Sequence, residues 1–294
     1  MENLLNIFKK IGIEISDLFN TGIKQKSNNT SINKSGDVQD SVDLMSNDVF
    51  KSNLSKSSLV HSFASEEENN VIKVNDDGKY FVVFDPLDGS QNIEPNLILG
   101  SIFGVFDKTP GNIKDGNDLV ASGYVLYGPA IQLVFAYEGK VTLYRFNRLN
   151  NEFEIEKELD KINEGKFYSI NESNSKRWLN PNIREYVEYL KKNNKSNRWD
   201  GCMVADVHRV IMLGGSFSYP RDSKSKEGKL RLLYECYPMS FIVNMLGGKC
   251  ITDNTEKIEN ILDVAYPNDN VHQKSSILIL GNNEFDKYRI HVDL

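Results

Sequence analysis

The sequence predicts an α/β protein built from two adjoining lobes. Strand-like segments follow one another through residues 79–155, with helical patterns ahead of them, which indicates a large sheet covered by helices. Beyond a charged stretch at residues 157–166, helical and strand-like segments are mixed. A chain of 294 residues can bury roughly 75% of its unfolded surface, which is enough for two lobes without disulfides. We therefore predict an N-terminal lobe of residues 1–160 and a C-terminal lobe of residues 161–294.

The N-terminal region has the pattern of two helices joined by a polar loop. Apolar residues at helical spacing predict an amphipathic helix packed on the body of the protein. These residues are Leu4, Phe8, Ile11, Ile15 and Leu18. Residues 21–42 are rich in Asn, Ser, Lys and Gly, and we expect a mobile loop there. A second helix is predicted over residues 42–54.

The central segments have the composition of buried strands. Residues 79–84, with the sequence KYFVVF, form an apolar run that leads directly into DPLDGS at 85–90. Gly, Pro or Asn separates most of the runs that follow. These further predicted strands are residues 99–106, 119–126, 131–137, 141–146 and 152–155.

The second half of the chain mixes helices and strands. Residues 182–192 have a helical pattern, residues 203–213 form a short apolar run, and residues 230–234 are predicted to be a strand. A helix over residues 238–246 begins with a proline and is followed by two glycines.

The charge balance bears on the class of partner. The chain carries 35 basic and 41 acidic residues, a formal net charge of −6, and its pI is about 5.4. Nucleic acids and anionic membranes bind strongly basic surfaces, so neither is predicted to be the main partner. A small anionic substrate held in a local basic pocket fits this composition.

The cysteines and the apolar runs predict a cytoplasmic protein. Cys202, Cys236 and Cys250 are odd in number and lack CxxC spacing, so we expect reduced thiols. No apolar run approaches the ~20 residues of a membrane span. Acidic residues among the N-terminal lysines fit neither a secretory signal nor a transit peptide.

Residues 85–90 place two carboxylates at the end of the predicted 79–84 strand. Pro86 fixes its φ and Gly89 permits a tight turn, so Asp85, Asp88 and the Leu87 carbonyl can converge on one point. Mg²⁺ prefers such oxygen ligands, and the amides after Gly89 can receive a phosphate oxygen. The motif alone is equally consistent with an acidic loop that caps a helix.

Two other acidic segments can likewise be interpreted either as metal ligands or as ordinary surface structure. Residues 65–68, with the sequence SEEE, fit either a solvated face or a further set of metal ligands. Residues 229–235, with the sequence KLRLLYE, place an acid at the end of an apolar run with alternating basic residues before it. This second segment alone also fits an ordinary strand edge with salt bridges. The conjunction of all three segments favours a metal site.

Four blocks of sequence together resemble the class I fructose-1,6-bisphosphatase family, in the family's order and close to its spacing. They are FDPLDGS at 84–90, GSIFGVF at 100–106, MVADVHR at 203–209 and GKLRLLYECYPM at 228–239. The resemblance implies an α-β-α-β-α layered sandwich. It also implies an enzyme of gluconeogenesis that hydrolyses the 1-phosphate of fructose-1,6-bisphosphate to give fructose-6-phosphate and phosphate.

The resemblance also implies the residues of the metal site. Two or three Mg²⁺ ions, with Mn²⁺ as an alternative, are expected to be held by Glu66, Asp85, the Leu87 carbonyl, Asp88 and Glu235. Three acids match the family's catalytic residues: Asp43 and Glu67 position and deprotonate the attacking water, and Asp37 closes over the metals. Clustered Mg²⁺ ions can activate water and stabilise the leaving alkoxide together.

Six further positions match residues that hold the sugar bisphosphate. These are Ser90, Asn171, Arg198, Met203, Tyr219 and Lys229. Ser90 contacts the reacting phosphate, Met203 holds the sugar through its backbone, and the others bind the distal phosphate. The family residue that matches Arg198 reaches the neighbouring subunit's site, so the resemblance implies a homo-oligomer, specifically a homotetramer.

The chain departs from the family pattern at three positions. Trp199 stands where the family usually has Tyr, Asn174 where it often has Tyr, and Gln91 where it usually has Ser. These changes leave room for a longer sugar, so sedoheptulose-1,7-bisphosphatase is an alternative. A catalytically weak regulator that binds sugar phosphates is another alternative. An inositol-phosphate phosphatase ranks lower, because the block at 229–235 indicates a bisphosphate.

The resemblance also bears on inhibition by AMP. The family's N-terminal AMP-binding segment has no match, so we expect AMP to inhibit weakly or not at all, although Lys79 and Tyr80 match other AMP-contacting residues.

Overall fold

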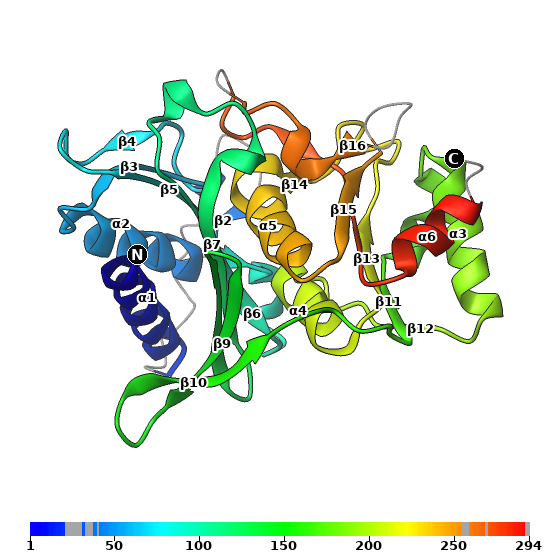
Figure 1. Ribbon diagram of the computed structural model, residues 1–294, viewed down its shortest axis with the longest axis horizontal. Coiled ribbons are helices and arrows are strands. Elements are labelled where there is room, and N and C mark those ends of the chain that lie inside the picture. The colour runs from blue at the N-terminus through cyan, green and yellow to red at the C-terminus, as the bar shows by residue number, and fades with distance from the viewer. Residues whose placement is uncertain (21–30, 33–37, 40, 254–258, 268–269, 292–294) are drawn as a thin grey trace.

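A computed structural model describes the chain except for residues 21–30, 33–37, 40, 254–258, 268–269 and 292–294. Five layers follow one another along the long axis of the molecule, in the order helix, sheet, helix, sheet, helix (Figure 1). The layered sandwich predicted from the family resemblance is therefore confirmed. No helix in the described ranges is long and apolar enough to cross a membrane.

Two helices form the first layer. The N-terminal helix α1 (Glu2–Asn20) and helix α2 (Ser41–Ser55) cover the outer face of the large sheet (Figure 1). The Phe8 ring of α1 stacks on Phe103 at a centroid distance of 3.7 Å, and the Phe50 ring of α2 stacks on Phe84 at 4.3 Å. Both predicted helices are confirmed, because each has an apolar face to bury.

Most of the predicted mobile loop at residues 21–42 lies outside the described residues. Its described parts include two short paired strands, β1 (Ser31–Ile32) and β2 (Val38–Gln39). Helix α2 begins at Ser41, so the end of the predicted loop is already helical.

The large sheet has eight strands in the order β10-β9-β8-β7-β6-β5-β3-β4. Neighbouring strands are antiparallel except β3 and β5, which are parallel. The strands are β3 (Val60–Ser65), β4 (Ile72–Lys73), β5 (Tyr80–Asp88), β6 (Leu99–Phe106), β7 (Leu119–Tyr127), β8 (Ile131–Tyr137), β9 (Lys140–Asn147) and β10 (Glu152–Leu159). Every predicted strand of this region is present.

Strand β5 is buried on both faces, which explains its unbroken apolar run. Phe81 and Val83 point into the middle layer, whereas Val82 and Phe84 point toward α1 and α2. Successive side chains of a strand point to opposite faces, so a strand between two helical layers has no polar face.

The second sheet separates the middle helices from the last helical layer. Helices α4 (Met203–Leu213) and α5 (Tyr237–Met245) lie between the sheets, and α3 (Pro181–Lys192) and α6 (Glu284–His291) cover the far side (Figure 1). The six strands run in the order β12-β11-β13-β18-β15-β16. They are β11 (Phe167–Ser169), β12 (Ser196–Asn197), β13 (Ser216–Tyr219), β15 (Lys249–Thr252), β16 (Glu259–Asn260) and β18 (Ile277–Leu280).

Two predicted elements are corrected. The strand predicted over residues 230–234 consists only of β14 (Leu230–Arg231), which pairs with β17 (Lys274–Ser275), and a π-helical turn, Leu232–Cys236, follows it. Short, fully buried apolar runs have the same appearance in a strand and in a helix, which explains the error. The strand predicted to end at residue 84 continues as β5 through the acidic motif to Asp88.

Candidate active site

A cavity of about 450 Å³ lies where the ends of β3 and β5 meet β13, β14 and the start of α4. It brings together eleven of the fourteen residues predicted for the site. These are Asp43, Glu66, Glu67, Asp85, Leu87, Asp88, Ser90, Met203, Tyr219, Lys229 and Glu235. They come from six separate segments of the chain, so the fold has gathered them at one point.

Three buried carboxylates form the centre of the cavity. Asp85, Asp88 and Glu235 each offer an oxygen, and these oxygens all lie within 4.8 Å of one another. Burial and repulsion by Glu66 and the neighbouring carboxylates raise the pKa of Asp85 and of Glu235 well above their usual values. Burial also raises the pKa of Asp88, although hydrogen bonds and Lys229 oppose the shift.

The end of β5 presents these groups because its backbone bulges. Asp85 pairs with Ile102 of β6 and Asp88 with Gly100, so three steps along β5 match two along β6. The N–H of Leu87 donates to Asp85 Oδ1 at 3.0 Å, which fixes the first carboxylate inside the bulge.

Asp88 links the large sheet to the start of α4, in the middle helical layer. Its Oδ2 accepts the backbone N–H of Val204 at 2.7 Å and lies 3.1 Å from the Cys202 thiol, which donates to it. Gly89 makes this approach possible, because its φ is +81° and a Cβ there would lie 2.6 Å from the Cβ of Cys202. The tight turn predicted at Gly89 is therefore present, followed by a 3₁₀ turn, Ser90–Asn92.

The SEEE segment divides into two acids that line the cavity and one that contacts helix α2. Glu66 and Glu67 line the cavity at the end of β3. Glu68 points elsewhere: its Oε1 accepts from Asn47 at 2.9 Å and from Lys51 at 2.6 Å, so it ties β3 to α2.

The residues present fit a divalent cation. Their donors are all carboxylate or carbonyl oxygens, the set preferred by Mg²⁺ and similar hard ions. Three carboxylates this close and this buried repel one another unless a cation neutralises them. The sequence-based prediction of a metal site at this place is thus consistent with the geometry.

The other end of the cavity is aromatic and cationic. The indole of Trp199 stacks on Phe217, with ring centroids 6.1 Å apart, and lies 5.7 Å from the ring of Tyr219. The ammonium group of Lys229 lies 5.8 Å from the centre of the Tyr219 ring. Trp199 and Gln91, two departures from the family pattern, both line this cavity.

Three predicted residues are not among those lining this cavity. Asn171 lines a small adjoining cavity together with Asn174, and its side chain accepts the N–H of Ser173. Arg198 is exposed, and its guanidinium donates to the carbonyl of Asn197 at 2.9 Å. Asp37 lies outside the described residues.

Arg209, which the sequence did not single out, fixes the segment that carries Arg198 and Trp199. Its guanidinium donates to the Arg198 carbonyl at 3.0 Å and to Asp206 Oδ1 at 2.9 Å, and it forms an ion pair with Asp200. Burial raises the pKa of Asp206 to about 6.

The sequence also missed two cations of the cavity, Arg231 and Lys274. Nε of Arg231 lies 3.3 Å from Glu66 Oε1, and the backbone N–H of Arg231 donates to Glu235. The alternation of basic and apolar residues at 229–231 in the sequence was a usable signal for Arg231. Lys274 follows no recognisable motif, and only strand pairing brings it to the site.

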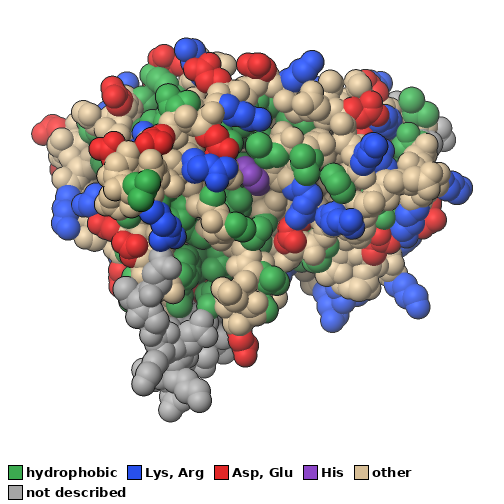
Figure 2. Space-filling view, turned by 90° about the horizontal axis from the view of Figure 1, so that it is seen from below, with side chains coloured by type: hydrophobic (Ala, Val, Ile, Leu, Met, Phe, Trp, Pro, Cys, Tyr) green, Lys and Arg blue, Asp and Glu red, His purple; other side chains and the backbone are tan. Residues whose placement is uncertain are grey.

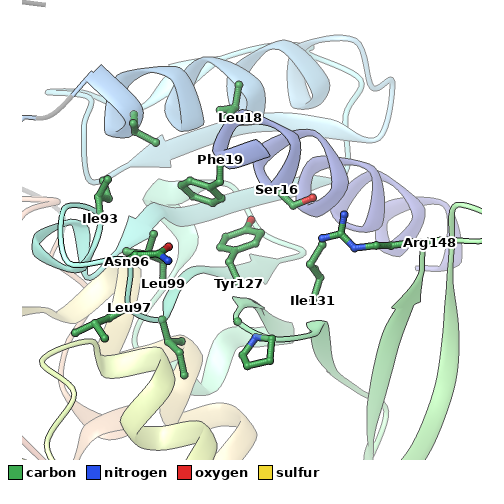
Figure 3. Close-up of a pocket in the computed structure, with 14 residues that line it drawn as sticks. Ser16, Leu18, Phe19, Ile93, Asn96, Leu97, Leu99, Tyr127, Ile131 and Arg148 are labelled. Atoms are coloured by element: carbon green, nitrogen blue, oxygen red, sulfur yellow. The ribbon is translucent and has the colours of Figure 1, made fainter. Parts of the chain in front are cut away.

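A second, larger cavity of about 620 Å³ lies at the end of α1 (Figure 3). Phe19 and Tyr127 face one another in it, with ring centroids 5.5 Å apart, and Arg148 is its charged lining residue. It contains none of the predicted site residues and no carboxylate in its described lining. Since phosphate-ester hydrolysis with a hard metal needs oxygen ligands, we place the chemistry in the smaller cavity.

The charge on the face seen in Figure 2 is mixed. Figure 2 shows acidic and basic side chains interspersed over one face of the molecule. This distribution accords with the prediction that a polyanion is not the main partner.

Comparisons with known proteins agree with this geometry. The family model described as "Fructose-1-6-bisphosphatase, N-terminal domain" matches residues 6–158, and the one described as "Fructose-1-6-bisphosphatase, C-terminal domain" matches residues 162–290. The chain is similar to the solved structure of Leishmania major fructose-1,6-bisphosphatase in its holo form, with a TM-score of 0.90 and 33% identity, over 99% of this chain and 94% of that one.

Curated relatives carry the same family name. Fructose-1,6-bisphosphatase class 1 of Neisseria meningitidis serogroup B is 36% identical over 277 residues, which cover 88% of this chain and 83% of the relative. The protein of that name from Sulfurihydrogenibium sp. is 38% identical over 264 residues, or 87% and 80% of the two chains. These names do not favour the sedoheptulose, inositol-phosphate or regulator alternatives. The chain belongs to the class 1 fructose-1,6-bisphosphatase family, and as a member it is a metal-dependent phosphatase.

Proposed function

We propose that this protein hydrolyses the 1-phosphate of fructose-1,6-bisphosphate with Mg²⁺, giving fructose-6-phosphate and phosphate. The observation that carries the proposal is the cluster of Asp85, Asp88 and Glu235 in one cavity with cationic side chains. Carboxylates hold the metal, and cations bind the phosphates that the metal does not reach. One cavity thus supplies both requirements of a sugar bisphosphate.

The metal ligands we propose are the three clustered carboxylates, Glu66 and the Leu87 carbonyl. Mg²⁺ ions held there would activate a water molecule and neutralise charge on the phosphoryl oxygens. The Leu87 N–H and the Val204 N–H fix the carboxylates of Asp85 and Asp88, so these ligands are oriented before any ion binds.

Asp43 and Glu67 are the proposed proton acceptors for the attacking water. Asp43 is buried in the first turn of α2, and both acids line the cavity beside the carboxylate cluster. Glu67 is held in place through its own N–H, which donates to Ser65 Oγ at 3.2 Å. Asp37, outside the described residues, is proposed by family resemblance to close over the metals.

The substrate is proposed to span the cavity from the carboxylates to Lys229. Ser90 begins the 3₁₀ turn after Gly89, and it is proposed to contact the reacting phosphate there. Met203, the first residue of α4, also lines the cavity, and Tyr219 and Lys229 lie together at the proposed distal end. Asn171, in the adjoining cavity, completes the proposed distal phosphate site.

Phosphate release from three substrates tests this function. With Mg²⁺ present, kcat/KM for fructose-1,6-bisphosphate should exceed the values for sedoheptulose-1,7-bisphosphate and inositol-1-phosphate. Equal efficiency on all three would refute a dedicated distal site. A clear preference for the sedoheptulose substrate would instead favour the sedoheptulose-1,7-bisphosphatase alternative.

We further propose a homotetramer in which Arg198 completes the neighbouring subunit's distal phosphate site. Its exposure and its position outside the cavity of its own chain support this role. Arg198→Ala should raise KM about tenfold or more and change kcat little, because the lost contact is remote from the reacting phosphorus. Steady-state kinetics, with sedimentation to confirm that the variant still assembles, measures this. A fall in kcat at unchanged KM would contradict the assignment.

The lobe boundary and the location of the protein are also proposals. Lobes of residues 1–160 and 161–294 are supported by the two sheets, because the last strand of the large sheet ends at Leu159 and the second sheet begins at Phe167. A cytoplasmic location is supported by the three free, buried cysteines.

A further inference from the structure

Lys274 lines the cavity that contains the carboxylate cluster, and the proposed function gives it no role. It belongs to β17, whose two residues pair with β14 in an antiparallel ladder. In that ladder Lys274 lies directly opposite Arg231. Directly opposite residues of an antiparallel pair project from the same face, so the two cationic side chains are neighbours.

The residue of β14 that Lys274 pairs with indicates the end of the cavity at which Lys274 lies. Lys229 and Arg231 are separated by one residue, with Lys229 near the Tyr219 ring at the distal end. Arg231 lies at the other end, with its Nε 3.3 Å from Glu66 Oε1. Since Lys274 is the partner of Arg231, it belongs to the end that holds the carboxylates.

The strand that carries Lys274 is fixed on both sides. The carbonyl of Gln273 accepts the N–H of Leu232 at 2.9 Å. Nε2 of His272 lies 2.9 Å from the Glu68 carbonyl, in hydrogen-bond contact with the segment that carries Glu66 and Glu67. The backbone therefore holds the lysine beside Arg231, and only its side chain can adjust.

This arrangement places two like charges opposite one another, which destabilises a strand pair. Arg231 has Glu66 as a counter-ion, but no carboxylate in the described part of the chain forms an ion pair with Lys274. An anion bound in the cavity between the lysine and the metal ligands would offset this repulsion.

We propose that Lys274 binds the phosphoryl group at the metal end of the cavity and retains the inorganic phosphate product. The proposal rests on the proposed function and adds a cation to its site. Lys229 then binds the distal phosphate, whereas Lys274 and the metal share the reacting one. Loss of Lys274 should thus weaken binding of inorganic phosphate, a ligand that has no distal end.

Binding of inorganic phosphate in the presence of Mg²⁺ tests this role in wild type, Lys274→Met and Lys274→Arg. Lys274→Met should leave the ligand-free melting temperature unchanged or higher, because it removes the repulsion with Arg231. Its dissociation constant for phosphate, and the inhibition constant of phosphate as product, should rise about tenfold or more. Lys274→Arg should restore most of the affinity. The exposed Lys249→Gln serves as the matched control and should match wild type.

Wild-type phosphate affinity in Lys274→Met would overturn the proposal, whether or not the variant is less stable. Failure of Lys274→Arg to recover affinity would also overturn it, since a role in packing rather than charge would then explain the loss. Failure of the proposed function is distinguishable, because the wild-type protein would then release no phosphate from fructose-1,6-bisphosphate. The phosphate-binding measurement does not depend on turnover.

Discussion

Glu235→Gln is expected to lower kcat/KM by about 10³-fold or more while making the metal-free protein more stable. The loss of activity follows because Glu235 is one of three carboxylates whose oxygens lie within 4.8 Å. The gain in stability follows because burial and neighbouring acids already raise the pKa of Glu235, so its charged form is costly in the fold. Glutamine keeps an oxygen for the Arg231 N–H and removes the charge.

Kinetics and thermal melting of the same preparation measure both effects. Glu185→Gln, on the exposed side of α3, is the matched control and should change neither. A less stable, inactive Glu235→Gln protein would mean that the residue mainly supports the fold. An active variant would remove Glu235 from the metal site.

The carboxylate cluster should destabilise the metal-free protein increasingly as the pH rises above about 4, and Mg²⁺ should reverse this effect. Asp85 and Glu235 have pKa values raised above the usual ~3.9 and ~4.3, so the folded state holds their protons more tightly than the unfolded state does. Their contribution is complete below the unfolded pKa and is lost as the pH rises through the folded pKa. Mg²⁺ binds the deprotonated form, so its stabilising effect should grow with pH, reaching about 2.7 kcal/mol at a hundredfold excess over Kd.

Comparison with Glu235→Gln isolates this effect from other groups. Burial lowers the pKa of His208 to about 4, so that residue destabilises the fold as the pH falls below 6.5 and opposes the trend. His208 is present in both proteins, so the difference between their melting temperatures reports the carboxylate cluster. The gap should be small near pH 4 and should widen in favour of the variant up to pH 8 without metal. A gap independent of pH, or no response of the wild type to Mg²⁺ with phosphate present, would refute the coupling.

The sequence by itself predicted the carboxylates that gather in the cavity and most of the strands of the first sheet. Asp85 and Asp88 are close in the chain, and a strand followed by Pro86 and Gly89 leaves few ways to arrange them, so local rules suffice. The apolar run of β5 likewise has no polar face, which predicts burial on both sides. Short-range patterns are readable because the residues that cause them are neighbours.

The C-terminal half was less readable because its segments are short. Strand β18 has the sequence ILIL, with Ile277 and Ile279 in the middle core and Leu278 and Leu280 in the outer one. A run of four apolar residues is too short to show the hydrophobic periodicity that distinguishes a strand from a helix. The turn after Arg231 is π-helical and buried, so its apolar residues resembled a strand.

Tertiary structure alone decided which distant residues meet at the cavity. Cys202 and Val204 donate hydrogen bonds to Asp88 from more than a hundred residues away, and Lys274 reaches the cavity through its pairing with Arg231. Arg198, predicted to bind the distal phosphate, is not among the residues that line its own chain's cavity. The sequence specifies chemistry through residue type and local spacing, whereas the distance between two charges depends on the packing of the whole chain. Whether a carboxylate becomes a ligand or, like Glu68, an ordinary hydrogen-bond acceptor is therefore settled only in the folded protein.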